Sequence, residues 1–170
     1  GIELDLTYVI SERWSVEFRS AYFDATVGEW QDRLCEAGFD APDDGIYCPA
    51  ESGSELSELP KWNTNTQLIY FRPLDTGWIL YSTLSWTWRS KAAIDSIVTN
   101  RYNDPQSFVN FNVGMAKDEF FVTVWGKNLT DQQNIQTPFN TENGDPSLPP
   151  ALTASPNEGM EYGVTLGYYF

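Results

Sequence analysis

The last ten residues of the chain, 161–170, alternate between large apolar side chains and small or polar ones. The large apolar side chains occupy every second position: Tyr162, Val164, Leu166, Tyr168 and Phe170. Successive side chains of an extended strand point to opposite faces, so this pattern predicts a β-strand with one continuous apolar face. The segment also ends on an aromatic residue, where a strand that closes a soluble protein normally ends in polar residues.

The same two-residue period recurs along the rest of the chain. We predict six further strands, over residues 2–10, 14–26, 62–72, 78–89, 107–115 and 120–129. Charged side chains in these segments fall on the face opposite the apolar one. Arg72 is the exception, at a strand end where a long side chain can reach an interface. The chain has no apolar run long enough for a transmembrane helix. We therefore predict an all-β, antiparallel protein.

The connections between these strands alternate in length. Short turns are predicted at residues 11–13, 73–77 and 116–119, and long loops at about 27–61, 90–106 and 130–159. Transmembrane β-barrels of the bacterial outer membrane combine short periplasmic turns with long extracellular loops. They also end in the way this chain ends, on an aromatic residue. We therefore expect the apolar face to contact lipid, the long loops to be extracellular and the C-terminus to be periplasmic.

The number of strands adds a further expectation. If residues 161–170 descend to the periplasm, counting back through seven strands places Gly1 on the extracellular side. Seven is odd, whereas single-chain bacterial barrels are usually even-numbered with both ends inside. We expect the chain to be the C-terminal portion of a larger barrel, whose remaining strands pair with its first and last strands.

Four segments resemble the C-terminal third of a TonB-dependent receptor barrel. They are Gly-Ile-Glu-Leu-Asp-Leu at 1–6, Leu-Pro-Lys-Trp at 59–62, Trp-Thr-Trp-Arg-Ser-Lys at 86–91 and Val-Trp-Gly-Lys-Asn-Leu-Thr-Asp at 124–131. They occur in the order in which that family has them, and together they span the chain. The resemblance implies a transmembrane barrel of 22 strands, of which this chain supplies the last seven. A plug domain and a TonB box would lie upstream.

The resemblance also implies a function. It is TonB-energised uptake of a scarce nutrient across the bacterial outer membrane, the nutrient being a siderophore, another metal complex or an oligosaccharide. The implied partners are outer-membrane lipid, the TonB complex acting through the plug, the barrel assembly machinery and the ligand. The alternating residues from Tyr162 to Phe170 resemble the signal that this machinery reads. No cofactor is expected.

Composition excludes several other functions. A net charge of −14 argues against binding to nucleic acid. The absence of histidine removes Ser-His-Asp and Cys-His catalysis and most zinc sites. We therefore expect no catalytic chemistry in this portion. A passive porin or adhesin barrel, and a secreted soluble carbohydrate-binding β-sandwich, remain the alternatives.

The loop at 27–61 contains two candidate sites. In an exported protein, Cys35 and Cys48 would most simply form a disulfide that staples the loop. Asp40, Asp43 and Asp44 are a weaker candidate for a calcium site, because their spacing does not match an EF-hand loop. A solvated acidic loop, or a negatively charged mouth that favours neutral or cationic ligands, is the alternative.

Aromatic residues supply the last group of candidates. Those in the long loops could stack on ligand rings, although ordinary packing explains any single one of them more simply: Trp30, Phe39, Tyr47, Tyr102 and Phe139. Those near the strand ends are interpreted as girdles at the two lipid interfaces: Trp14, Trp62, Trp78, Trp86 and Trp88. One pairing is also predicted. If Ile10 opposes Trp14, then Asp5 lies opposite Arg19.

Overall fold

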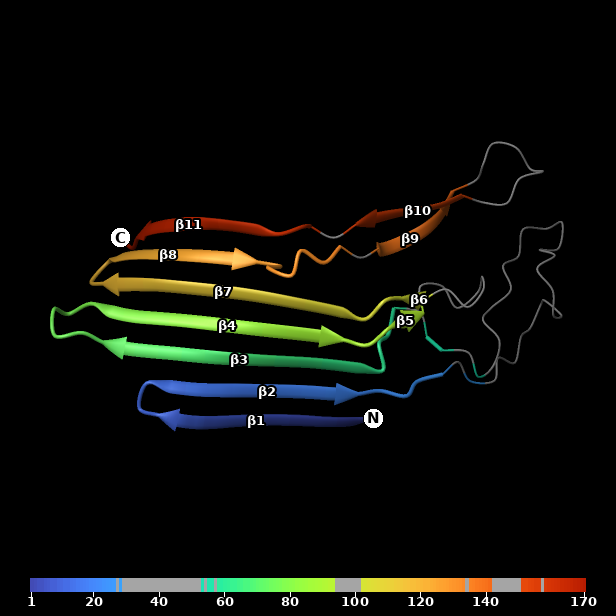
Figure 1. Cartoon of the computed structure of the whole chain (residues 1–170), viewed down its shortest axis with the longest axis horizontal. Helices are drawn as coiled ribbons and strands as arrows, with labels where there is room; N and C mark the ends of the chain where they lie inside the picture. Colours follow the sequence, from blue (N-terminus) through green and yellow to red (C-terminus); the bar gives the residue numbers. More distant parts are fainter. Residues whose placement is uncertain are drawn as a thin grey trace.

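The computed structural model describes residues 1–26, 28, 53, 55–56, 58–93, 102–133, 135–141, 151–156 and 158–170. For 135–141 and 151–156 it describes the course of the backbone. Within these ranges the chain forms β-strands joined by turns (Figure 1). No helix of the described residues is long and apolar enough to cross a membrane.

Seven strands form one antiparallel sheet in the order β1-β2-β3-β4-β7-β8-β11. Their bounds are β1 (Ile2–Ser11), β2 (Trp14–Tyr22), β3 (Trp62–Pro73), β4 (Ile79–Arg89), β7 (Gln106–Lys117), β8 (Phe120–Lys127) and β11 (Glu161–Tyr168). The seven predicted antiparallel strands are confirmed. The sheet is open, with β1 at one edge and β11 at the other.

The short turns and Phe170 lie at one end of the sheet, which we call the turn end (left in Figure 1). Gly1 and the longer connections lie at the opposite end, which we call the loop end. At the turn end, Leu74 donates its amide to the carbonyl of Trp78, and Gly77 adopts a positive φ of 80° that glycine accommodates without strain. The short turns and the long connections that alternate along the sequence therefore lie at opposite ends of the sheet.

The register keeps the apolar positions of neighbouring strands aligned. One row runs across five strands through Tyr8, Val16, Leu68, Leu84 and Phe111. A slip of one residue in any strand would turn its whole apolar set to the other face. The pattern that predicted the strands therefore also fixes how they pair.

The first turn corrects one prediction. Ser11, not Ile10, lies opposite Trp14, and the register shifts between Val9 and Ser11. An extra residue at such a shift is a β-bulge, which sequence alternation does not reveal. The pairing inferred from this turn is nevertheless right, because Asp5 lies opposite Arg19.

Two predicted loops contain strands of their own. β5 (Ala92–Ala93) pairs with β6 (Tyr102–Asn103), and β9 (Ile135–Thr141) pairs with β10 (Ala151–Pro156). These hairpins lie beyond the loop end of the sheet (Figure 1). Three strands end earlier than predicted, β2 at Tyr22, β8 at Lys127 and β11 at Tyr168. Beyond β2, Thr26 forms an isolated bridge with Glu55.

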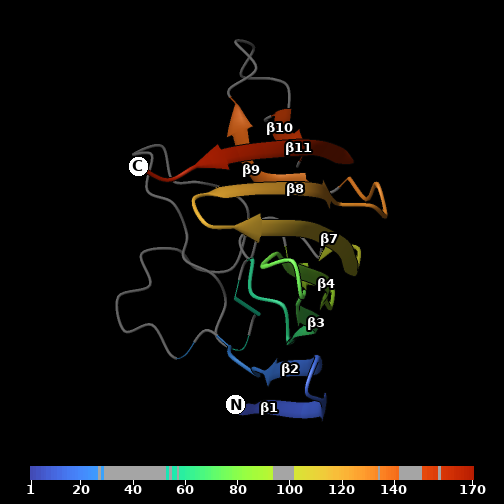
Figure 2. The same ribbon diagram turned by 90° about the vertical axis from the view of Figure 1, so that its left-hand side faces the viewer.

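The described strands form a single layer, with no second sheet packed against them (Figure 2). Among the described residues, Ala93 is the one buried apolar residue, and no large side chain is fully buried. By contrast, Ile2, Tyr162 and Leu166 are each more than 70% exposed. A sheet of this size without a core has two open faces, and the two faces carry different kinds of side chain.

Candidate functional site

One face of the sheet, which we call the outer face, is predominantly apolar, with a few small hydroxyl residues such as Ser20, Thr64 and Ser107 among its apolar side chains. It carries the alternate residues that begin with Ile2 on β1 and end with Tyr168 on β11. In its middle, Val113, Val124 and Val164 lie side by side on three successive strands, and their side chains are 44%, 45% and 63% exposed. Exposed apolar surface of this extent marks a surface that contacts another protein, a membrane or a ligand.

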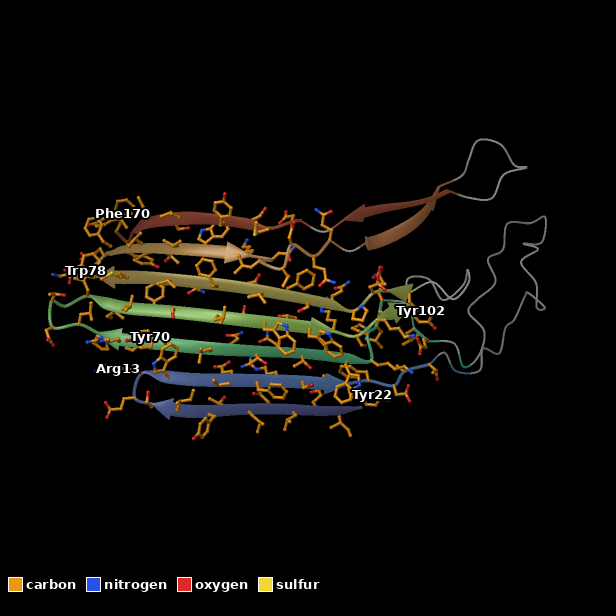
Figure 3. All side chains as sticks on the ribbon, in the orientation of Figure 1. Arg13, Tyr22, Tyr70, Trp78, Tyr102 and Phe170 are labelled. Atoms are coloured by element: carbon orange, nitrogen blue, oxygen red, sulfur yellow. The ribbon has the colours of Figure 1, made fainter. Side chains whose placement is uncertain are left out.

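Aromatic pairs border the outer face at both ends (Figure 3). At the loop end the rings of Tyr22 and Trp62 lie 4.9 Å apart. At the turn end the rings of Trp14 and Tyr70 lie 4.5 Å apart. The two residues of β2 in these pairs are eight positions apart, or about 27 Å along a strand that rises about 3.4 Å per residue. A second turn-end pair, between β8 and β11, has its ring centroids 4.7 Å apart.

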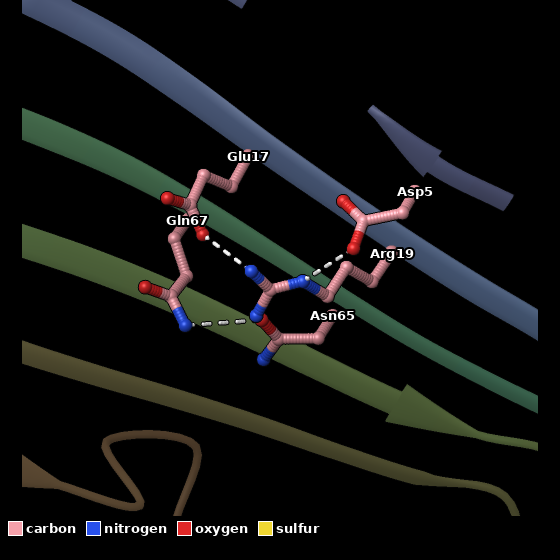
Figure 4. A network of polar contacts seen from close by, with 5 residues as sticks. All are labelled: Asp5, Glu17, Arg19, Asn65 and Gln67. Carbon is pink, nitrogen blue, oxygen red and sulfur yellow. Dashed lines mark hydrogen bonds and ion pairs between the residues drawn. The ribbon is translucent and has the colours of Figure 1, made fainter. Parts of the chain in front are cut away.

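The opposite face, which we call the inner face, is held by polar contacts (Figure 4). Arg19 pairs through Nε with Asp5 at 3.1 Å and through Nη2 with Glu17 at 3.0 Å. This confirms the predicted pairing of Asp5 with Arg19. Next to it, the Nδ2 atom of Asn65 donates to Oγ1 of Thr87 at 2.8 Å. Exposed ion pairs stabilise a fold little, so their main effect here is to order the side chains.

Aromatic rings cover glycines on the inner face. Trp125 of β8 lies over Gly163 of β11, where an added Cβ would come within 2.6 Å of the ring, and its Nε1 donates to Thr165 at 3.0 Å. Tyr81 lies over Gly114 in the same way. The glycines let the rings lie flat against the neighbouring strand, because a side chain there would push them away.

At the loop end, the segment 128–132 is tied down by one buried side chain. Asn128 is 7% exposed, and its Nδ2 donates to the carbonyls of Gln132 and Glu158 at 3.0 Å each. Its Oδ1 accepts from the hydroxyl of Thr130 and from the backbone N–H of Gln132. The backbone N–H of Asn128 donates to Oδ1 of Asn110 at 2.8 Å. We call these residues the Asn128 cluster.

The cluster explains the Lys-Asn-Leu-Thr-Asp segment in physical terms. Asn128 and Asp131 both have φ near +48°, a conformation that asparagine and aspartate tolerate better than most residues. Oδ1 of Asp131 accepts from the amide of Met160 at 3.0 Å, and Thr130 donates to the carbonyl of Ser107 at 2.7 Å. The contacts of the cluster therefore fix where β7 begins, where the connection after β8 leaves the sheet and where β11 is entered.

The base of the loop at 27–61 is closed by an ion pair. Nζ of Lys61 lies 3.0 Å from Glu55 and 3.3 Å from Asp24. Hydrogen bonds to Glu55 and then to Asp24 raise the pKa of Lys61 above its ordinary value. The amide of Phe23 also donates to the carbonyl of Lys61 at 2.8 Å.

The structure places only some of the candidate ligand residues. Tyr102 lies in β6, 40% exposed, with Nζ of Lys91 4.6 Å from the centre of its ring. Phe139 belongs to β9, but its side chain is outside the described part. The remaining candidates lie outside the described residues: Trp30, Cys35, Phe39, Asp40, Asp43, Asp44, Tyr47 and Cys48. Among the side chains that are described, no three acidic or thiol groups are close enough to hold a metal ion.

Sequence reasoning missed a hollow on the inner face. It has a volume of about 310 Å³, and it is lined by residues of β4, β7 and β8, most of them polar, with Trp125 among them. All of these except Phe111 and Gly126 belong to the inner-face half of an ordinary alternating strand, so nothing in one strand marks the hollow. Only the register of three strands, taken together, could have revealed it.

In comparisons with known proteins, no family model, curated protein or solved structure matches this chain.

Proposed function

We propose that this sheet is part of the wall of a β-barrel in the bacterial outer membrane, of the TonB-dependent receptor type. The observation that carries the proposal is the outer face: a predominantly apolar surface across seven strands, bordered at both ends by aromatic pairs. Outer-membrane barrels have an apolar band about 25 Å tall between two aromatic girdles. The roughly 27 Å between the pairs on β2 suits such a band, because the strands of a barrel are tilted.

Contact with lipid would bury the apolar side chains that the described sheet leaves exposed. Burying one Val, Leu, Ile or Phe side chain contributes about 1.5–3 kcal/mol, and a single layer in water forgoes most of this. Ile2, Leu6 and Leu166 are 73%, 52% and 77% exposed although they lie in regular strands. Acyl chains against the outer face would remove this surface from water without a second protein layer.

The polar inner face would then face the lumen. The charged strand residues Asp5, Glu17 and Arg19 are all on this face, where water or other protein groups can solvate them. In this orientation the turn end is periplasmic, the loop end is extracellular, and the Asn128 cluster lies at the base of the extracellular loops.

Strand direction supports a barrel larger than the described sheet. β1 and β11 both run from the loop end to the turn end, so direct pairing of the two edges would be parallel. An odd number of additional strands would complete an antiparallel wall. The fifteen strands that a 22-stranded barrel would add are an odd number.

The TonB-dependent type is favoured by the four sequence segments and their order. The structure gives one of them a physical role, because Asn128 and Asp131 fix the exit from β8 and the entry to β11. On this proposal, the protein binds a scarce nutrient at the cell surface and admits it with energy from the inner membrane. The extracellular loops would contribute to ligand binding and the plug to gating.

Uptake measurements test this function. Cells that express the complete protein should accumulate its nutrient against a gradient, and they should lose this uptake when TonB is deleted or the proton-motive force is collapsed. Uptake that continues unchanged without TonB, and that scales linearly with nutrient concentration, would indicate a passive barrel and contradict the proposal. Surface binding of the nutrient should persist in both backgrounds, which serves as the control for expression.

A further inference from the structure

The hollow on the inner face gathers polar groups from three adjacent strands. Its inner-face lining residues are Thr83, Ser85, Asn110, Asn112, Trp125 and Lys127, and Phe111 and Gly126 complete the lining. They form two rows across β4, β7 and β8: Ser85 lies opposite Asn110 in one, and Asn112 lies between Thr83 and Trp125 in the other. The rows span about 10 Å across the strands and about 7 Å along them. This footprint accommodates one six-membered ring with its substituents.

The polar groups in the hollow differ from those around it. Elsewhere on the inner face, amides and hydroxyls bond to one another, as Asn65 does to Thr87 and Tyr81 to Thr123. In the hollow, no hydrogen bond within the described part of the chain reaches the side chains of Thr83, Ser85 or Asn112. Two hydroxyls and an amide are thus left free to bind a ligand.

An aromatic platform lies beside these groups. The ring of Trp125 is held in position by Gly163 beneath it and by the hydrogen bond from Nε1 to Thr165. Nζ of Lys127 lies 5.3 Å from the centre of this ring. None of the ion pairs among the described residues includes Lys127, so its ammonium group can donate to a ligand oxygen in the hollow.

We propose that this hollow is a subsite for a pyranose sugar. The indole ring borders the hollow on the β11 side and offers apolar contact to C–H groups of a sugar, while the amide of Asn112 and the hydroxyls of Ser85 and Thr83 bond to its hydroxyl groups. Lys127 donates to a ring or carboxylate oxygen. The inference rests on the proposed function, because it requires the inner face to line a transport lumen, and it narrows the nutrient to a saccharide.

Binding measurements on the complete protein in detergent test the subsite. The probes are methyl pyranosides of glucose, galactose, mannose and glucuronate and their short oligosaccharides, and the affinities come from calorimetry and saturation-transfer NMR. Asn112→Ala should weaken binding about three- to tenfold, since one hydrogen bond is lost. Asn65→Ala is the matched control, because it removes the same group from the same face outside the hollow, and it should leave the affinity unchanged. Trp125→Phe should weaken binding while keeping a ring.

Three results would overturn the subsite: no probe binds, Asn112→Ala and Asn65→Ala have equal effects, or a catechol iron complex binds in this hollow where sugars do not. The same samples are run unheated and heated on gels, since a folded barrel shows heat-modifiable mobility. An intact barrel without Asn112-dependent sugar binding refutes the sugar subsite alone. A protein that forms no barrel refutes both the subsite and the proposed function.

Discussion

A charge placed on the outer face should be costly, although the position is largely open in the described sheet. Val164 is 63% exposed, so its replacement loses little packing against protein. It lies four residues from Tyr168, or about 14 Å along the strand from the aromatic pair that β11 forms with β8 at the turn end. Arginine costs about 2–4 kcal/mol at the middle of the bilayer and 0–1 kcal/mol near its interfaces. For Val164→Arg we therefore expect a loss of about 2–3 kcal/mol.

The neighbouring position provides the control. Thr165 lies on the inner face and accepts one hydrogen bond from Trp125. Thr165→Arg should cost about 1 kcal/mol, the net contribution of one hydrogen bond. Both variants of the complete protein are refolded from urea into phosphatidylcholine vesicles, without assembly machinery, and the free energy of unfolding is measured by tryptophan fluorescence. If Thr165→Arg proves the more costly of the two, as it would with both faces in water, the outer face does not contact lipid.

Three further predictions concern packing, the loop base and pH. Gly167→Ala should destabilise the protein by about 1–3 kcal/mol, because the new methyl group would clash with the ring of Phe121. In the double variant that also carries Phe121→Ala, most of this loss of stability should disappear, as measured in the same urea titration. Asn128→Ala should cost about 3 kcal/mol, because it leaves several backbone groups unpaired and places alanine at a positive φ, and hydrogen exchange should increase first at the loop end. The raised pKa of Lys61 means that its ion pair contributes fully below the unfolded pKa of 10.5 and is lost as the pH rises through the folded value. The protection factor at the base of the loop, which compares the observed exchange rate with the intrinsic rate at the same pH, should therefore fall above pH 10.5 in the native protein and stay unchanged in Lys61→Met.

Most of the sheet could be predicted from the sequence because its strands are long and two-sided. Alternation identifies a strand wherever one face carries mainly apolar side chains and the other mainly polar or small ones, and the seven strands of the main sheet show this pattern. The pairing of Asp5 with Arg19 was inferred from an assumed pairing of Ile10 with Trp14, and it held although Ser11 takes that place. The bulge at Ile10 could not be predicted, because an extra residue at a strand end leaves the alternation on either side intact.

The hairpins and the hollow were missed for different reasons. β9 contains Pro138 and β10 ends at Pro156, and both lie beyond the apolar face, so they lack the alternation and the composition that identify a strand. The hollow arises from register: Ser85, Asn112 and Trp125 are far apart in sequence and meet only because three strands pair as they do. The aromatics and cysteines of the loop at 27–61 remain predictions, because they lie outside the described residues.

The contact of the outer face with lipid can be measured directly with two tryptophans. Trp86 lies on the outer face, 41% exposed, and Trp125 lies on the inner face, bonded to Thr165. Two variants of the complete protein, each retaining one of these residues with the other tryptophans replaced by Phe, are reconstituted with lipids brominated along their acyl chains. We expect strong quenching of Trp86 and little quenching of Trp125. Equal quenching of the two, or none of either, would contradict a membrane wall.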